Sequence, residues 1–252
     1  MEWHVGCSGF HYKEWKGIFY PEKLPQRRWF EYYSTQFDTL ELNVTFYRFP
    51  QVPYLQNWYA ISPDHFSFAV KVPRLITHYK KFKDTERMLD DFYTSISQGL
   101  REKLGPVLFQ LPPQLIYSDE TLDLILKSVS PEFDNVIEFR HASWWTKKVQ
   151  EKLGERGISF CGISYPRLPD QAVINTNLAY YRFHGLTKLY YSGYSNKELE
   201  RVANAIHKAK KANRGFVYFN NTATAAAIEN AIYLREFIKK LDTGRKRKSA
   251  KV

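Results

Sequence analysis

Short apolar runs that end in polar or charged residues recur along the chain. The clearest is the segment 135–141, where Asn135-Val-Ile leads into Glu138-Phe139-Arg140-His141. Because side chains alternate along a strand, Glu138 and Arg140 share one face and Phe139 lies on the other. The same order recurs in segments 40–43, 68–71, 107–110, 181–184 and 216–221. Strands that become polar at their carboxyl ends are typical of a (β/α) barrel with a site at that mouth.

Helical patterns separate these apolar runs. Trp29, Phe30, Tyr33 and Phe37 recur at spacings of three or four, which predicts a helix with one packed face. The capping box Ser195-x-x-Glu198 predicts the start of another helix. We predict strands at 3–7, 39–44, 66–71, 106–111, 135–141, 158–164, 179–184 and 215–220, and helices at 26–37, 53–60, 84–105, from 118, 143–153, 195–212 and 224–241. No helical period follows the strand at 158–164.

The regular alternation of strands and helices predicts parallel strands. A doubly wound sheet also alternates in this way, but it usually has a glycine-rich phosphate turn after its first strand. Here that place reads Gly6-Cys-Ser-Gly9, without the GxGxxG spacing. We therefore predict a single-domain α/β fold, a (β/α)8 TIM barrel over residues 1–241.

The net charge of +11 is unevenly distributed. Residues 239–252 hold seven Lys or Arg and one Asp, which gives +6, and the remaining +5 belongs to the body. We predict that residues 242–252 form a basic, disordered tail. Such a tail can bind nucleic acid through charge alone, or it can simply aid solubility. A high isoelectric point is therefore weak evidence for a nucleic-acid partner.

Several features predict a cytoplasmic protein without a membrane segment. No apolar run approaches the roughly 20 residues of a membrane helix. The chain enters Trp3-His-Val-Gly-Cys7 with no basic and apolar leader, so we expect no signal peptide. Cys7 and Cys161 fall in different predicted strands without CxxC spacing, so we expect reduced thiols in the core.

Three basic residues near predicted strand ends are candidates for binding an anion. Arg140 and Arg182 would form a bidentate clamp, and Lys71 would add a third charge. Lys71 could instead form a Schiff base, although anion binding requires no depressed pKa. The alternative to anion binding is that Arg140 or Arg182 forms a salt bridge with Glu138 and holds the mouth of the barrel together.

Acid–base candidates lie at the same strand ends. His184 has an ordinary pKa near neutrality, and Glu138 and Glu41 are the other catalytic candidates. The alternative for His184 is a buried histidine whose nitrogens are hydrogen-bonded within the core. The alternative for Glu138 and Glu41 is a salt bridge within the barrel, because a buried charge must be paired. The further substrate-binding candidates are Gln110, Asn220, Asn221, His141 and Trp15. His184, Glu41 and Glu138 could supply a mixed nitrogen and oxygen set for a metal, but no HExxH or similar spacing supports one, and the sequence leaves the cofactor unknown.

Several motifs together resemble the YecE-like family of TIM barrels, a domain of unknown function (DUF 72). They are Gly6-x-Ser8-Gly9, Trp15-x-Gly17-x-Phe19-Tyr20-Pro21, Glu41-x-Asn43-x-Thr45-Phe46-Tyr47-Arg48, Lys71-x-Pro73, Thr77-His78, Gly105-Pro106-x-Leu108-x-Gln110-Leu111-Pro112-Pro113, Glu138-Phe-Arg140-His141-x-Ser143-Trp144, Arg182-x-His184-Gly185 and Tyr218-Phe-Asn220-Asn221. They extend from residue 6 to about residue 230. The resemblance implies one TIM barrel but no reaction. Relatives often carry acids at the positions of Thr222 and near Ser164, which argues against an acid-rich mechanism here.

Two functions from different classes fit these observations. The first is an enzyme acting on an anionic, phosphorylated or nucleotide-like substrate at the carboxyl-terminal mouth. The second is a nucleic-acid-binding or nuclease-like barrel that uses the body charge, the tail and the exposed aromatic residues. Non-catalytic ligand binding at the same mouth is a third reading. Fold alone does not choose among them, and the sequence does not define an oligomeric state.

Overall fold

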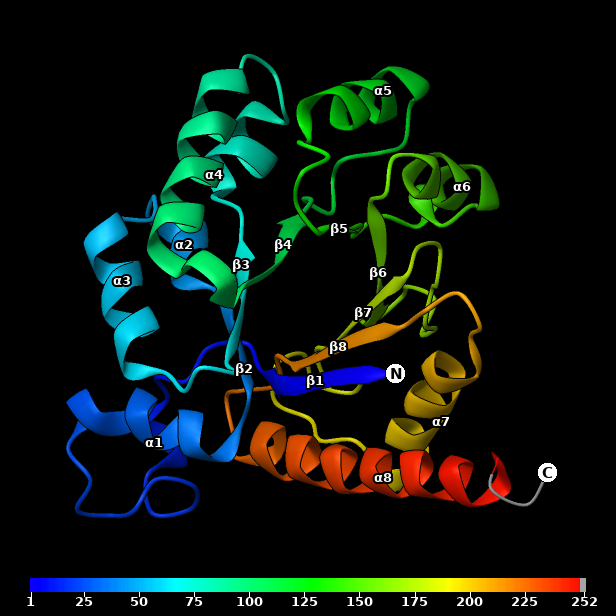
Figure 1. The fold of residues 1–252 in the computed structure, drawn as a ribbon. Coiled ribbons are helices and arrows are strands. Elements are labelled where there is room, and N and C mark those ends of the chain that lie inside the picture. Colours follow the sequence, from blue (N-terminus) through cyan, green and yellow to red (C-terminus); the bar gives the residue numbers. More distant parts are fainter. Residues whose placement is uncertain (250–252) are drawn as a thin grey trace.

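In the computed structural model, eight strands form the centre of the molecule and helices lie around them (Figure 1). The structure describes residues 1–249, and the side chains of residues 1–241. The strands are β1 Glu2–Cys7, β2 Thr39–Leu42, β3 Ser67–Lys71, β4 Leu104–Gln110, β5 Asn135–Glu138, β6 Ser159–Ser164, β7 Leu178–Phe183 and β8 Arg214–Phe219. Each coincides with a predicted strand to within a few residues.

The strands follow one another around a nearly closed barrel. Their order is β1-β8-β7-β6-β5-β4-β3-β2, and every neighbouring pair is parallel. An isolated parallel bridge from Ser8 to Glu41 joins the end of β1 to β2, where the Gly9 amide donates to the Glu41 carbonyl at 2.9 Å. The predicted TIM barrel is therefore confirmed, and all strand carboxyl ends lie at one mouth.

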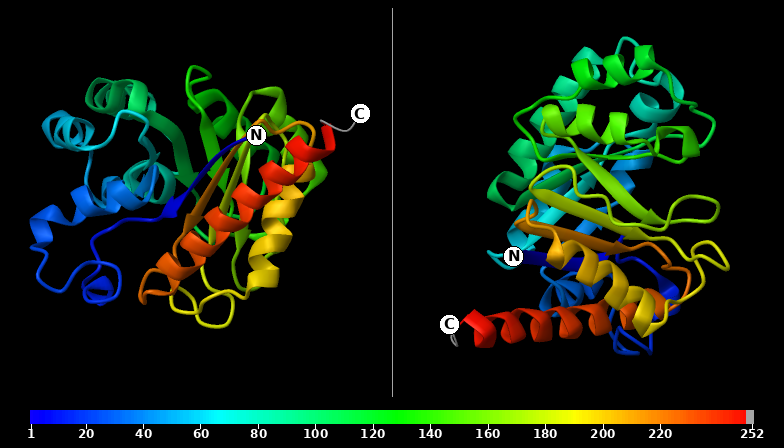
Figure 2. Two further views of the ribbon diagram at one scale, coloured as in Figure 1. Left: turned by 60° about the horizontal axis from the view of Figure 1, so that its bottom comes forward. Right: turned by 90° about the vertical axis from the view of Figure 1, so that its right-hand side faces the viewer.

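The helices cover the outside of the barrel (Figures 1 and 2). They are α1 Trp29–Gln36, α2 Val44–Tyr47, α3 Val52–Ile61, α4 Glu86–Leu100, α5 Asp119–Ser128, α6 Lys147–Glu155, α7 Asn196–Lys208 and α8 Ala226–Ser249. Ser118 accepts from the Thr121 amide at 3.1 Å, and the capping box of Ser195 and Glu198 is present. As predicted, no helix follows β6 among residues 165–177.

Both boundaries of helix α4 differ from the predicted range of 84–105. Helix α4 begins at Glu86, and Asp84 does not cap it. Asp84 has φ of 50°, in the left-handed region, which is incompatible with the extended backbone of a usual N-cap. The helix also ends at Leu100, before a short 3-10 segment over Arg101–Lys103.

The barrel interior is packed in layers, as expected for this fold. An apolar and aromatic layer is formed by Ala69, Leu108, Val136, Cys161, Ile163, Leu178, Tyr180, Phe216 and Tyr218. Toward the carboxyl ends, the hydroxyl of Tyr180 donates to Glu41 Oε2 at 2.6 Å, where charged side chains replace apolar ones. Cys7 and Cys161 are both buried and free, as predicted, and burial raises the pKa of each thiol. The floor of the mouth is thus polar, above an apolar base.

The carboxyl-terminal helix continues further than the sequence pattern predicted. Helix α8 extends to Ser249, beyond the predicted end at residue 241. Lys and Arg are good helix formers, and cations near a helix carboxyl terminus interact favourably with its dipole. Residues 250–252 of the predicted tail lie outside the described part, and disorder of the tail stays a prediction. Within residues 1–249, no helix is both long and apolar enough to cross a bilayer.

Candidate functional site

A network of ion pairs fills the barrel below the mouth. Arg182 on β7 donates to Glu41 Oε1 and to Glu138 Oε2, each at 2.6 Å. Glu41 also accepts from the hydroxyls of Ser8 and Tyr180 at 2.6 Å. The side chains of Arg182, Glu41 and Glu138 are all completely buried. These contacts give both carboxylates the partners that a buried charge requires.

Glu138 is held in its ionised form. Burial opposes its charge, but the guanidinium groups of Arg140 and Arg182 outweigh burial and keep the pKa of Glu138 well below its ordinary value. A carboxylate enclosed by two guanidinium groups carries no proton to donate near neutral pH. The structure places Glu138 and Glu41 in the salt-bridge network that was the alternative to catalysis, and their catalytic roles stay predictions.

His184 is also completely buried, and it links the network to the mouth. Its Nε2 lies 3.2 Å from Arg140 Nη2 and 3.5 Å from Glu138 Oε2, and its Nδ1 lies 2.9 Å from Asn220 Nδ2. Burial, reinforced by Arg140, lowers the pKa of His184 well below its ordinary value. His184 is thus a neutral histidine whose two ring nitrogens both contact neighbouring side chains, and its acid–base role stays a prediction.

The predicted anion clamp of Arg140 and Arg182 is not formed. Arg182 is enclosed by Glu41 and Glu138. Arg140 is 7% exposed, donates from Nε to Glu138, and packs its guanidinium 4.2 Å from the ring centre of Tyr165. Both guanidinium groups are paired with carboxylates inside the protein. They form a structural salt-bridge network in place of the predicted clamp.

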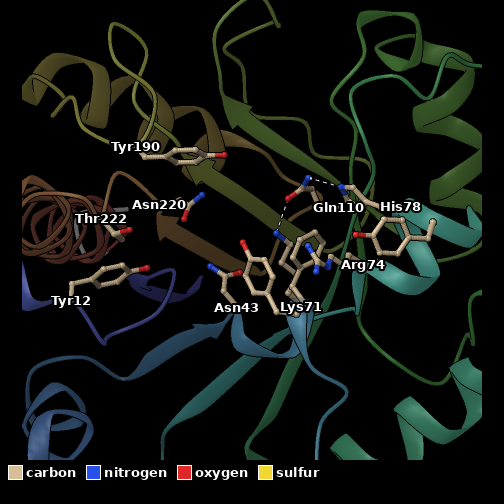
Figure 3. A pocket seen from close by; sticks show the side chains of 12 residues that line it. Tyr12, Asn43, Lys71, Arg74, His78, Gln110, Tyr190, Asn220 and Thr222 are labelled. Atoms are coloured by element: carbon tan, nitrogen blue, oxygen red, sulfur yellow. Dashed lines mark hydrogen bonds between the residues drawn. The ribbon is translucent and has the colours of Figure 1, made fainter. Parts of the chain in front are cut away.

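A cavity of about 540 Å³ opens at the carboxyl-terminal mouth (Figure 3). Its lining comes from the ends of β2, β3, β4 and β8 and from the loops that follow strands. The lining residues are Tyr12, Asn43, Phe46, Tyr47, Lys71, Arg74, His78, Tyr79, Gln110, Tyr190, Asn220 and Thr222. Three of the predicted ligands, Lys71, Gln110 and Asn220, therefore meet in one cavity.

Lys71 is the most deeply placed cation of this lining. It is 7% exposed, its Nζ donates to Gln110 Oε1 at 2.6 Å, and it lies 3.8 Å from the ring centre of Phe46. Burial, followed by the charge of Arg182, lowers the pKa of Lys71 to about 7, although Glu138 and Glu41 act in the opposite direction. An amine and an ammonium are both accessible to this side chain at neutral pH.

His78 lies on the same wall as Lys71. Its Nε2 is 3.5 Å from Gln110 Nε2, its Nδ1 is 2.9 Å from Thr77 Oγ1, and its ring packs edge-on against Phe46. Burial, followed by Lys71 and Arg140, lowers the pKa of His78 to about 4. His78 is therefore a neutral imidazole at the edge of the cavity.

The segment that carries His78 has an unusual backbone. A π-helix spans Leu75–Lys80, a conformation that is rare and frequent at functional sites. It is followed by Lys81, Phe82 and Asp84, each a non-glycine residue with φ between 50° and 67°. Such left-handed residues store strain that the surrounding fold must hold, and they cluster at binding sites. This backbone conformation makes the β3–α4 connection a candidate functional segment, independently of its charges.

Arg74 stands at the exposed rim of the cavity (Figure 3). Its guanidinium lies 5.4 Å from the ring centre of Tyr47 and 5.6 Å from that of Tyr79. Neither an ion pair nor a hydrogen bond to Arg74 occurs within residues 1–241. Two aromatic rings therefore hold a guanidinium whose donors remain free for a ligand.

The opposite wall is formed by polar groups without formal charge (Figure 3). Tyr12, Asn220 and Thr222 lie there, and Tyr12 donates to the Ser8 carbonyl at 2.6 Å. Burial, opposed by a hydrogen bond to Thr222, raises the pKa of Tyr12 to about 12. Thr222 is the position where the resemblance led us to expect an acid in relatives. Its hydroxyl leaves this wall uncharged.

The other predicted ligands lie outside the cavity. Trp15 is completely buried and donates to the Thr224 carbonyl at 3.0 Å, so it is a core residue. His141 caps a 3-10 turn by accepting from the Ser143 amide. Asn221 is buried and donates to the Ser192 carbonyl at 3.1 Å. We therefore withdraw these three from the binding site.

Sequence reasoning missed Arg74 and undervalued Asn43 and His78. All three follow strand ends, which was a usable signal, but the exposure of Arg74 depends on an unpredicted π-helix. The side-chain oxygen of Asn43 is buried and has no hydrogen-bond partner in the described part of the chain. No group of three or more His, Cys, Asp or Glu side chains arranged for a metal ion occurs among the described residues.

Comparison with known proteins agrees with the predicted family. The family described as "Protein of unknown function DUF72" matches residues 4–251. The chain is 25% identical to the UPF0759 protein YunF of Bacillus subtilis, over 87% of this chain and 89% of that protein. It is 27% identical to the UPF0759 protein YecE of Escherichia coli O157:H7, over 57% of this chain and 53% of that protein.

Solved structures with the same fold include a DUF72 family protein of Thermotoga maritima, with a TM-score of 0.86 and 28% identity over 95% of this chain and all of that one. A DUF72 family protein of Enterococcus faecalis aligns with a TM-score of 0.82 and 20% identity, over 94% of this chain and 95% of that one. The match to the family covers nearly the whole chain, as the sequence motifs predicted. The chain therefore belongs to the DUF72 family.

Proposed function

We infer that the protein is an enzyme that binds a small anionic molecule at the carboxyl-terminal mouth of the barrel. One observation carries this inference: the cavity lining contains two side chains that can carry a positive charge, Lys71 and Arg74, and none of its twelve residues is Asp or Glu. A concave site lined by basic groups and lacking carboxylates concentrates anions. The nearest acids of the interior, Glu41 and Glu138, are paired with Arg182 and leave the cationic lining uncompensated.

The two cations would take different parts of the ligand. Arg74 has a planar fork of donors suited to a phosphate or a carboxylate. Lys71 lies deeper, beside the amide of Gln110, whose oxygen has a second lone pair that can accept from a ligand hydroxyl. This combination fits a small phosphorylated or carboxylated molecule that also carries hydroxyl groups.

The size of the site favours a small molecule over a nucleic-acid strand. A cavity of about 540 Å³ falls within the usual range of small-molecule pockets. The alternative of nucleic-acid binding uses the charge of the body, the exposed aromatic residues and the basic residues beyond residue 241, whose side chains lie outside the described part. Strong phosphate binding at the mouth, independent of the tail, separates the two functions.

Thermal unfolding in the presence of inorganic phosphate tests this function. A ligand present at 100 times its dissociation constant stabilises the fold by about 2.7 kcal/mol. We expect phosphate to raise the melting temperature of the wild type above that in chloride at matched ionic strength. Arg74→Gln should reduce the rise, and Arg27→Gln, at an exposed arginine outside the lining, should preserve it. Equal melting temperatures in phosphate and chloride would refute an anion site.

A further inference from the structure

We propose that the amine of Lys71 forms a reversible imine with the carbonyl carbon of an anionic aldehyde or ketone held in this cavity. The substrate class is then a phosphorylated aldehyde or a 2-oxo acid. This inference rests on the proposed function, because Arg74 would hold the anionic end of the substrate while Lys71 meets the carbonyl. It changes the role of Lys71 from a counter-charge to a nucleophile.

The surroundings of Lys71 differ from those of a structural lysine. No carboxylate lies within ion-pair distance of its Nζ among the described residues, and Gln110 Oε1 at 2.6 Å is the hydrogen-bond acceptor recorded for it. The ring of Phe46 covers one side at 3.8 Å. By contrast, buried Lys103 donates to the carbonyls of Tyr59 and Ser62 and to a hydroxyl. Lys71 is thus held in place by one amide and one ring, with its nitrogen at the cavity wall.

Electrostatics supports a neutral amine at this position. Burial and the charges of Arg182 and Arg140 disfavour the ammonium form, and Glu138 and Glu41 favour it. The Phe46 ring also favours the ammonium form, as cation–π contacts do. The balance leaves the pKa of Lys71 near 7. An ordinary lysine with a pKa near 10.4 is neutral in only about one molecule in 2,500 at pH 7.

The chemistry balances without a further reactant. The lone pair of Nζ forms a bond to the carbonyl carbon, and a proton passes from nitrogen to oxygen to give a carbinolamine. A proton from solvent then joins the carbinolamine hydroxyl, which leaves as water while the nitrogen lone pair forms a protonated C=N bond. Addition of water reverses every step. The neutral imidazole of His78, on the same wall, can accept and return the proton.

Reductive trapping tests this role of Lys71. The wild type is incubated at neutral pH with substoichiometric pyridoxal 5′-phosphate, an anionic aldehyde, and then reduced with sodium borohydride. Peptide mass spectrometry measures the secondary amine formed at each lysine. We expect Lys71 to be labelled at least about tenfold more than exposed Lys127, because its amine is neutral more often. Excess inorganic phosphate should reduce labelling of Lys71 and leave Lys127 unchanged.

Two further experiments distinguish imine formation at Lys71 from anion binding in the cavity. Preferential labelling of Lys71 by propionaldehyde, without protection by phosphate, would support the nucleophile and refute the anion site. Protection of the fold by phosphate, with Lys71 labelled no more than Lys127, would overturn the imine and preserve the anion site. Lys71→Arg keeps the charge without a nucleophilic amine, so it should lose preferential labelling. The ratio of Lys71 to Lys127 labelling in the wild type tests imine formation even if Lys71→Arg folds poorly.

Discussion

Arg182 on β7 and Glu41 on β2 form an ion pair across the barrel, with Nη2 2.6 Å from Oε1 and both side chains completely buried. The same guanidinium pairs with Glu138 on β5. Three strands are thereby joined by one side chain at the level where the barrel interior becomes polar. This network sets the floor on which Asn220 is positioned through His184.

Removing the central cation should destabilise the fold strongly. Arg182→Gln leaves the buried Glu41 without a cation and Glu138 with Arg140 alone, and breaking a buried ion pair costs about 3–5 kcal/mol. The free energy of unfolding in urea measures this cost. Arg28→Gln, which breaks the exposed pair with Glu31, should leave the free energy of unfolding nearly unchanged, because solvent screens this pair. A loss below about 1 kcal/mol for Arg182→Gln would contradict the structural role of the network.

The depressed pKa of Lys71 makes stability depend on pH. Its folded pKa of about 7 lies below the ordinary value of 10.5, so between these values the unfolded chain holds a proton that the folded chain has released. Stability from this group therefore rises with pH across that window, by up to about 1.4 kcal/mol per pH unit. It is lost as pH falls toward 7.

Urea unfolding of the wild type and Lys71→Met at about pH 7 and about pH 8.5 isolates this contribution. Other groups, including the buried thiols of Cys7 and Cys161, titrate in both proteins and cancel in the difference. We expect the wild type to gain stability relative to the variant as pH rises. Parallel pH dependence in the two proteins would show that Lys71 titrates normally.

A carboxylate added to the lining should weaken anion binding. Asn220→Asp is nearly isosteric and places a negative charge at the carboxyl end of β8, beside His184. We expect at least about a tenfold loss of phosphate affinity, equivalent to about 1.4 kcal/mol. Asn213→Asp makes the same change at the exposed amino end of β8 and should leave affinity unchanged. An equal loss in both variants would indicate a general charge effect.

The basic tail should be dispensable for the barrel. We expect deletion of residues 244–252 to leave the melting temperature nearly unchanged, because this stretch has no apolar period to bury. Any duplex DNA binding by the intact chain should fall steeply with salt and should largely vanish in the truncated protein. Gel-shift titrations at several salt concentrations measure both effects. Salt-independent binding, or full binding by the truncated protein, would argue against an electrostatic tail.

The fold could be predicted because its signals are local. Each strand is a short apolar run, and capping residues such as Ser118 and Ser195 mark helix starts. Eight strands that alternate with helices are compatible with only a few chain topologies. Asp84 was misassigned because its left-handed φ comes from the strained β3–α4 connection, which no sequence period reports.

The site could be predicted only in part, because alternation along a strand gives the face of a residue but not its depth. Arg182 and Lys71 both point toward the barrel axis near strand ends. Yet Arg182 lies at the level of Glu41 and Glu138, whereas Lys71 reaches the cavity. That difference depends on the stagger of the strands around the barrel. The free guanidinium of Arg74 depends on the π-helix in the same way.

The most direct test of the anion site is a calorimetric titration of inorganic phosphate into the wild type, Lys71→Gln and Lys127→Gln at neutral pH and matched ionic strength. Losing a hydrogen bond to a charged group costs about 1.5–3 kcal/mol, so Lys71→Gln should bind at least about tenfold more weakly. The wild type and Lys127→Gln, changed at an exposed lysine of α5 outside the lining, should bind one phosphate with equal affinity. Equal affinity in all three proteins, or no binding by the wild type, would contradict an anion site built on Lys71.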